Sequence, residues 1–230
     1  MRLPSLQVWE IEQLLFPVQC IACGALGVEL CLGCAPTPRE LSLQLKGVPQ
    51  TLLSSFIYDE VLSKIILAAK EENSRSAQFF LAKNFSALLL RAAKMLERQS
   101  LSVITVPSTP SAIAKRGYVH LDRVMRFVPA MSAISFESII TLKSRKGVRD
   151  QSEVGRSQRT ENVQGSFSLR GGSLAKVKLG VGIILVDDVV TTGSSMRESI
   201  RALNMAGIEP DMLISACISP RLASNRMVPS

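Results

Sequence analysis

The sequence predicts an α/β fold, a parallel sheet with helices on both faces, joined to a small cysteine-rich module near the start of its 230 residues. Two observations support this prediction. Short apolar runs rich in β-branched residues alternate with longer amphipathic segments, which is typical of parallel strands covered by helices. Four of the five cysteines lie in two C-x-x-C pairs, in a segment too short to bury a core of its own.

The apolar periodicity predicts the individual elements in chain order. We expect helices over residues 5–16 (stopped by Pro17), 60–72, 76–98, 112–127 and from about 196 to Gly207, and strands over 52–60, 101–106, 139–142, 181–186 and 212–218. A Pro-containing stretch follows the cysteines, so we place a domain boundary at about residue 46, with a module over 1–46 and an α/β domain over 47–230. Cys217 is expected to be a core residue of a strand close to the sheet edge.

The cysteine pairs predict a metal site. Cys20 and Cys23 form one pair, and Cys31 and Cys34 form the other after a gap of seven residues. Glycines beside each pair allow the tight turns that bring four thiolates around one ion, and this spacing favours zinc in a zinc ribbon. Disulfides and an iron–sulfur site are the alternatives, but the lack of an export signal and the paired spacing favour zinc. Four cysteines leave no open coordination position, so a structural zinc is expected.

The segment IILVDDVVTTGSS, residues 183–195, predicts a phosphate site at the carboxyl end of a buried strand. The apolar run ends on Asp187 and Asp188, and the loop that follows consists of small residues before a helix. Unpaired N–H groups at a helix start bind phosphate, and small residues let the anion approach the backbone. The loop residues are Thr191, Thr192, Gly193, Ser194 and Ser195. Two carboxylates beside a phosphate need sugar hydroxyls or a divalent metal as partners, so the pattern indicates a ribose phosphate.

Two basic loops are expected near the same edge, because ligands bind outside the carboxyl ends of parallel strands. After the strand at 101–106, Lys115 and Arg116 lie near the start of a helix, where they are candidates to meet a leaving pyrophosphate. His120, the single histidine, is expected at the surface or partly buried rather than as a base. The second loop, KSRKGVRDQSEVGRSQRTENVQGSF, contains Arg156 and Arg159 and is expected to be a mobile basic flap that closes over the site or contacts nucleic acid.

Composition narrows the classes of function. A formal charge of +8 favours an anionic partner such as a phosphate, a nucleotide or nucleic acid. No run of eighteen apolar residues and no secretory leader pattern occurs, so we expect a cytoplasmic protein without a membrane span. No Walker or dinucleotide-binding glycine motif follows a strand-like run, which disfavours those nucleotide-binding classes. Aromatic residues are few, so a stacking platform for single-stranded nucleic acid is not evident.

These motifs resemble a known family. Residues 183–195 are similar to the phosphoribosyl-pyrophosphate (PRPP) signature of type I phosphoribosyltransferases, and the double C-x-x-C, the Arg-Gly-Tyr loop and the "DQ…GR…R…NV.G.F" segment together resemble the ComF family. The resemblance implies a zinc ribbon on a type I phosphoribosyltransferase fold, a role in DNA uptake during competence, and partners in the uptake machinery. It further implies that Asp187 and Asp188 contact ribose hydroxyls directly or through Mg²⁺, and that Thr191 to Ser195 hold the 5′-phosphate. Many members have Arg-Gly-Phe-Asn-Gln where this chain has Arg116 to His120, so a contact from that loop to an acceptor base is in doubt.

Two hypotheses follow. As an enzyme, the chain displaces pyrophosphate from PRPP with a nitrogen nucleophile, using Asp187, Asp188, Arg116, Arg156 and Arg159, with Lys115 as a further contact. As an adaptor, the chain binds PRPP or a nucleotide without turnover and engages uptake proteins or DNA through its module and basic flap. The sequence identifies no general base, acceptor or oligomeric state.

Overall fold

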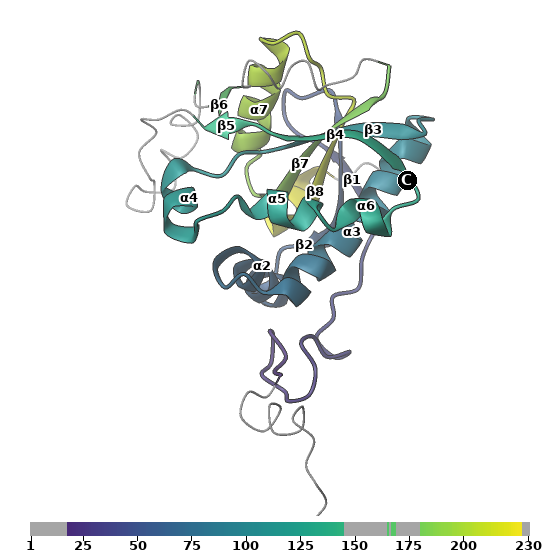
Figure 1. Cartoon of the computed structure of the whole chain (residues 1–230). Helices are drawn as coiled ribbons and strands as arrows, with labels where there is room; N and C mark the ends of the chain where they lie inside the picture. Colours follow the sequence, from purple (N-terminus) through teal and green to yellow (C-terminus); the bar gives the residue numbers. More distant parts are fainter. Residues whose placement is uncertain (1–17, 145–164, 166, 169–179, 227–230) are drawn as a thin grey trace, which may run out of the picture.

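The computed structural model describes residues 18–144, 165, 167–168 and 180–226 (Figure 1). The helix expected over residues 5–16 lies outside these residues, as does most of the basic segment, including Arg156 and Arg159. The elements are β1 (Leu41–Gln44), β2 (Thr51–Ile57), α2 (Glu60–Glu71), α3 (Arg75–Met95), β3 (Ser100–Thr105), α4 (Pro110–Arg116), α5 (His120–Met125), α6 (Val128–Met131), β4 (Ser135–Thr141), β5 (Lys143–Ser144), β6 (Phe167–Ser168), β7 (Gly182–Val190), α7 (Ser194–Asn204), β8 (Met212–Ile218) and α8 (Pro220–Arg226).

Six strands form the main sheet in the order β1-β2-β8-β7-β3-β4. Only β1 runs antiparallel to its neighbour, and the other adjacent pairs are parallel. The carboxyl ends of β3, β7 and β8 therefore meet at one edge, with Val186 opposite both Thr105 and Ile214. The loops after β3 and β7 are neighbours in space, which is the arrangement that creates a ligand site in parallel sheets.

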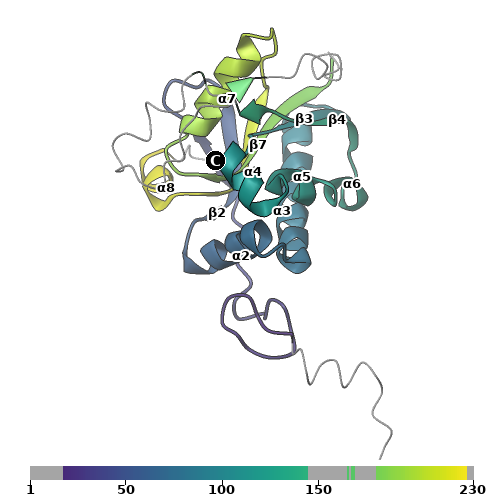
Figure 2. The same ribbon diagram turned by 60° about the vertical axis from the view of Figure 1, so that its left-hand side comes forward.

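Helices cover both faces of this sheet (Figures 1 and 2). α2, α3, α5 and α6 pack on one face, and α7 and α8 pack on the other. In β7, Ile184 and Val186 belong to the first core, whereas Ile183 and Leu185 belong to the second. A strand buried on both faces needs apolar residues at successive positions, which explains the nearly continuous apolar run. The predicted fold class is confirmed.

The prediction of a single helix over residues 112–127 is wrong. The chain forms α4 and α5 instead, because Gly117 adopts a left-handed conformation (φ 77°) and its N–H donates to the Ile113 carbonyl at 2.7 Å. Glycine takes this conformation at little cost, so it ends helices efficiently. The break lets a new helix begin at His120, whose side chain is buried with 1% exposure. The expectation of a surface or partly buried His120 is therefore also wrong.

The structure differs from the sequence-based expectations in two further ways, both at the lateral edge of the sheet formed by β1 and β2. The sequence does not predict β1, whose four residues follow a Pro-containing stretch. Because β1 pairs with β2 although it precedes residue 46, we propose that the α/β domain begins before Leu41. β1 and β2 also extend the sheet beyond β8, so Cys217 lies in an interior strand rather than near the edge, fully buried as expected of a core residue.

Residues 18–35, here called the cysteine module, lie beside α2 (Figure 2). The module has little regular structure, with one isolated bridge between Gln19 and Leu26. It is joined to the domain by a hydrogen bond from Lys64 Nζ to the Ala22 carbonyl at 2.9 Å, and by Ile21 and Leu30, which pack against the first core. Among the helices that the structure describes, none is long and apolar enough to cross a membrane.

Candidate functional site

The two adjacent aspartates lie near the carboxyl end of β7, at the carboxyl ends of the parallel strands. Asp187 and Asp188 are 9% and 6% exposed. The Asp188 N–H donates to Asp187 Oδ1 at 2.9 Å, and the Val189 N–H donates to Asp188 Oδ1 at 2.8 Å. These backbone contacts hold both carboxylates in defined positions. Two buried acidic groups side by side require a cation, a proton or hydrogen-bond donors as compensation.

The compensating cation is Lys70, in the last turn of α2. Its Nζ lies 2.5 Å from Asp188 Oδ2, and the two side chains are 31% and 8% exposed. His120 Nε2 lies 3.7 Å from the same oxygen, beyond hydrogen-bonding distance. Sequence reasoning missed Lys70, because nothing in the helical pattern distinguishes it from Lys64 on the same helix. Only the packing of α2 against the sheet brings one of these two lysines to the acidic pair.

The electrostatics of the site follow from burial and from this ion pair. Burial raises the pKa of Asp187 to about 8, and the charge of Asp188 adds to the effect. Burial opposes ionisation of Asp188 too, but the Lys70 ammonium lowers the pKa of Asp188 to about 2. Burial lowers the pKa of His120 to about 4. At neutral pH the site therefore contains an ionised Asp188, a charged Lys70 and a neutral imidazole.

The loop after β7 has the compact geometry expected of a phosphate site. Gly193 precedes the first turn of α7 with φ 78°, and a Cβ there would lie 3.0 Å from Leu45 Cδ1. The Thr192 and Ser194 hydroxyls are 2.7 Å apart, and the Ser194 N–H donates to Thr192 Oγ1 at 3.3 Å. Thr191 and Thr192 are exposed, so their hydroxyls are accessible from solvent. The N–H groups and hydroxyls at this helix start fit a phosphate.

A cavity of about 300 Å³ connects the acidic pair with the loop after β3. Its lining residues come from α2, the segment after β3, α4, α5, β7 and the start of α7: Lys70, Val106, Pro107, Ser108, Thr109, Ala112, Arg116, His120, Leu121, Asp187, Asp188, Val189 and Ser195. Within the described part of the chain, Arg116 Nη1 and both ring nitrogens of His120 are buried without a hydrogen-bond partner. Unmatched buried polar groups of this kind are costly unless a ligand satisfies them.

The two neighbouring basic residues of α4 lie in different environments. The Arg116 side chain is 5% exposed and lines the cavity, while its Nε donates to the Ala112 carbonyl at 3.0 Å. The Lys115 side chain is 76% exposed and pairs with Glu71 at 3.1 Å, away from the cavity lining. The structure thus brings Arg116 to the acidic pair and leaves Lys115 outside. The flap residues Arg156 and Arg159 lie outside the described residues.

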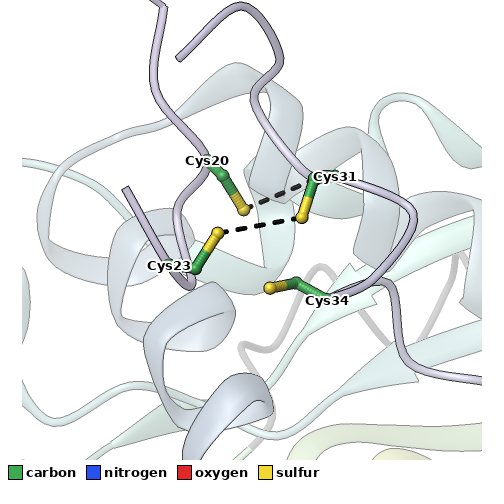
Figure 3. A group of neighbouring side chains, drawn as sticks. All are labelled: Cys20, Cys23, Cys31 and Cys34. Atoms are coloured by element: carbon green, nitrogen blue, oxygen red, sulfur yellow. Dashed lines mark hydrogen bonds between the residues drawn. The ribbon is translucent and has the colours of Figure 1, made fainter. Parts of the chain in front are cut away.

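The four cysteines of the module converge on one point (Figure 3). Their sulfur atoms all lie within 4.8 Å of one another, and Cys23 and Cys31 Sγ are 3.8 Å apart. A tetrahedral zinc with Zn–S bonds of about 2.3 Å requires sulfurs about 3.8 Å apart, so the cluster fits this ion. The Cys31 N–H donates to Cys20 Sγ at 3.4 Å, and this contact is the largest of several hydrogen bonds that lower the pKa of Cys20 to about 6. All four thiols are free of disulfides, as a zinc site requires.

Comparison with known proteins agrees with the fold and the loop. Residues 111–228, just over half of the chain, match the family described as "Phosphoribosyl transferase domain". This range contains Arg116, the acidic pair and the small-residue loop. The chain therefore belongs to the phosphoribosyl transferase domain family. The matched range excludes the cysteine module and α2, which carries Lys70.

Curated relatives share short segments with this chain. An orotate phosphoribosyltransferase from Bartonella tribocorum is 46% identical over 61 residues, which are 26% of this chain and 29% of the relative. Another, from Cupriavidus necator, is 41% identical over 46 residues, or 20% of each chain. The chain thus spans less than a third of the length of these relatives. A hypoxanthine phosphoribosyltransferase structure from Staphylococcus aureus covers 66% of this chain and 69% of its own, at 9% identity and a TM-score of 0.30, a likeness too slight to support an argument.

Proposed function

We propose that this chain binds PRPP in the cavity at the carboxyl edge of the sheet and transfers its phosphoribosyl group to a nitrogen acceptor. The observation that carries the proposal is the buried acidic pair of β7. It is followed directly by a small-residue loop at the start of α7, and it shares the cavity with unmatched polar groups of Arg116 and His120. Among the residues that line the cavity, Asp187 and Asp188 suit a sugar diol, and Arg116 and Ser195 suit phosphate oxygens.

The roles follow from where each group lies. Asp187 and Asp188 accept hydrogen bonds from the ribose hydroxyls, and Thr191, Thr192, Gly193, Ser194 and Ser195 hold the 5′-phosphate. Arg116 neutralises the departing pyrophosphate, together with Arg156 and Arg159 of the basic flap. A bond forms between the acceptor nitrogen and C1 of the ribose while the bond from C1 to the pyrophosphate oxygen breaks. Mg²⁺ would supply additional charge neutralisation when bound, held chiefly by the pyrophosphate oxygens of PRPP.

Calorimetric titration with PRPP, with and without Mg²⁺, tests the binding step. We expect saturable binding that falls about 30-fold or more in the double variant Asp187→Asn/Asp188→Asn, because a charge-assisted hydrogen bond to Asp188 contributes about 1.5–3 kcal/mol and a neutral one to Asp187 about 0.5–1.5 kcal/mol. Asp211→Asn is the matched control. Asp211 accepts a hydrogen bond from the Ile183 N–H at the amino end of β7, far from the acidic pair along the strand, and Asn keeps that acceptor. Equal PRPP affinity in the wild type and the double variant would contradict the proposal, and pyrophosphate release with nitrogen acceptors tests turnover.

The biological role that we propose is that of a ComF-type protein in DNA uptake, acting in the cytoplasm with a structural zinc in the cysteine module. A second candidate function is a non-catalytic adaptor that binds PRPP or a nucleotide and engages uptake proteins or DNA. One observation favours it: Leu26 and Leu32 of the module are 68% and 96% exposed, as expected of a surface that contacts a partner.

Transformation frequency in a naturally competent host that lacks its own ComF-type protein separates the two candidates. An enzyme requires the acidic pair, so Asp187→Asn/Asp188→Asn abolishes complementation. An adaptor retains complementation with that variant and loses it with Leu32→Ser or Cys34→Ser. Full complementation by all of these variants would exclude both roles.

A further inference from the structure

We propose that Lys70 is the resident counter-ion of the acidic pair and takes the place of a divalent cation at Asp188, so that a ribose phosphate binds these carboxylates without metal. The nature of the ligand rests on the proposed function, whereas the role of Lys70 as counter-ion does not. Any Mg²⁺ that accompanies PRPP then interacts with its pyrophosphate rather than with Asp188.

The ammonium group is held in place by its surroundings. Lys70 lies in the last turn of α2, where the helix dipole favours a cation. The Tyr118 hydroxyl donates to the Lys70 carbonyl at 2.9 Å, and the Tyr118 ring lies 4.3 Å from the Arg123 guanidinium. These contacts tie the end of α2 to the segment between α4 and α5. The ion pair to Asp188 is thus part of a packed interface rather than a chance contact of a surface lysine.

Both oxygens of Asp188 already have donors. Lys70 Nζ contacts Oδ2 at 2.5 Å, and the Val189 N–H donates to Oδ1 at 2.8 Å. A divalent cation would have to displace the ammonium group to coordinate this carboxylate. Strongly hydrated Mg²⁺ gives up water reluctantly, so this exchange is unfavourable.

A sugar diol fits the arrangement as it stands. An ammonium group has three N–H donors, and one of them is directed at Asp188. The others remain available to the oxygen of a ribose hydroxyl, whose own O–H donates to a neighbouring carboxylate. Lys70 would thereby make the oxygen contact that a metal ion otherwise provides.

Two measurements on the full chain test the inference, using wild type, Lys70→Met and the matched control Lys83→Met, an exposed lysine on α3. In the first, Mn²⁺ binding to the ligand-free protein is followed by electron paramagnetic resonance. We expect Lys70→Met to bind Mn²⁺ at least about tenfold more tightly than wild type, because removing the ammonium group leaves Asp188 uncompensated. Lys83→Met should match wild type. Equal Mn²⁺ affinity in wild type and Lys70→Met would overturn the role as counter-ion.

In the second measurement, ribose 5-phosphate, which lacks pyrophosphate, is titrated by calorimetry in EDTA and in Mg²⁺. Wild type should bind with affinities within about threefold of each other, whereas Lys70→Met should lose about tenfold or more in EDTA and recover in Mg²⁺. A wild-type protein that binds only with Mg²⁺ would overturn the metal-free binding. Failure of wild type to bind ribose 5-phosphate or PRPP under either condition would overturn the proposed function and the metal-free binding, and the Mn²⁺ comparison would still decide the role of Lys70. Lys70→Gln, which removes the charge but keeps a donor, replaces Lys70→Met if that variant does not fold.

Discussion

The cysteine module and the acidic site are both clusters of ligand-type side chains, but they are assembled in opposite ways. The four cysteines lie within residues 20–34, and their sulfurs come together through tight local turns. The acidic site joins Lys70 of α2, Arg116 of α4, His120 of α5 and the two aspartates of β7. A cluster of metal-ligand side chains can therefore be encoded by spacing alone, whereas a cluster at the end of a parallel sheet depends on which elements pack together.

The difference predicts how each region responds to damage. The module has almost no buried apolar residues of its own, so a metal ion held by its four cysteines would supply most of its stability. The acidic site rests on strands that are buried on both faces, so its framework survives the loss of any one ligand group. Disrupting one region should therefore leave the other largely intact.

The largest effect is expected from Cys34→Ser. Structural zinc contributes an apparent binding free energy of about 10–16 kcal/mol, so losing a ligand should release the ion and unfold the module. Elemental analysis should fall from one zinc per chain to nearly none, and a chelator should do the same to wild type. The sheet should keep its circular dichroism and its ribose phosphate affinity.

Cys217→Ala provides the control, since this buried cysteine of β8 lies outside the module and its loss should leave the zinc content unchanged. Global unfolding of Cys34→Ser would show that the two regions are not independent.

The next effect concerns Arg201→Met, on the helix that follows the phosphate loop. Glu198 is 4% exposed, accepts the Phe167 N–H at 3.1 Å and receives two hydrogen bonds of 2.7 Å from the Arg201 guanidinium. Removing the guanidinium leaves a buried carboxylate underpaired, so we expect a loss of about 2–3 kcal/mol in denaturant unfolding. Arg221→Met, an exposed residue on α8, should change stability by less than about 0.5 kcal/mol. Similar losses in both variants would argue against a specific role for the Glu198 contacts.

The same contacts predict a pH dependence. Burial alone would raise the pKa of Glu198, but the Arg201 guanidinium and the Phe167 N–H hold it below its usual value. A lowered folded-state pKa means that this stabilisation is present above the unfolded pKa of about 4.3 and is lost as the pH falls through the folded-state value. Wild type should therefore lose stability in acid more steeply than Glu198→Gln, as measured by urea unfolding between pH 6 and pH 3. The same dependence of stability on pH in wild type and Glu198→Gln would contradict a lowered pKa of Glu198 in the folded protein.

A smaller effect is expected from Gly193→Ala in the phosphate loop. An L-residue in the left-handed region costs about 1–2 kcal/mol, and its Cβ would also press on Leu45. Gly207→Ala is the matched control, because Gly207 has φ 73° but nothing within 4 Å of the added Cβ. Both variants should lose stability in thermal unfolding, but only Gly193→Ala should weaken ribose phosphate binding. A loss of affinity in Gly207→Ala as well would point to a global effect.

The smallest effect is expected from Lys115→Met. Its pair with Glu71 is largely exposed, and such pairs contribute about 0–1 kcal/mol. Stability and PRPP affinity should stay close to wild type, whereas Arg116→Met should weaken PRPP binding about tenfold or more, because its guanidinium faces the cavity. Equal effects of the two substitutions on calorimetric affinity would show that the position of the side chain is not what matters.

Several features were predictable because they are written in neighbouring residues. The cysteine cluster follows from the C-x-x-C spacing, and the site strand and its small-residue loop follow from one apolar run that ends on two aspartates. Other features depend on single residues whose effect is not local. Gly117 ends α4, so that the expected single helix is divided in two and His120 is buried in the cavity lining. Lys70 and Lys64 occupy the same helix, and the pattern of α2 gives no reason to choose between them.

The class of fold, the cysteine cluster and the order of aspartates and small residues in the loop after β7 are visible in the sequence, because they depend on periodicity and spacing along the chain. The ion pair between Lys70 and Asp188, the entry of Arg116 rather than Lys115 into the cavity, and the buried, neutral state of His120 are visible only in the folded protein. Those outcomes depend on burial and on distances between elements far apart in the chain. Such distances are set by how helices pack on the sheet, and no local pattern contains them.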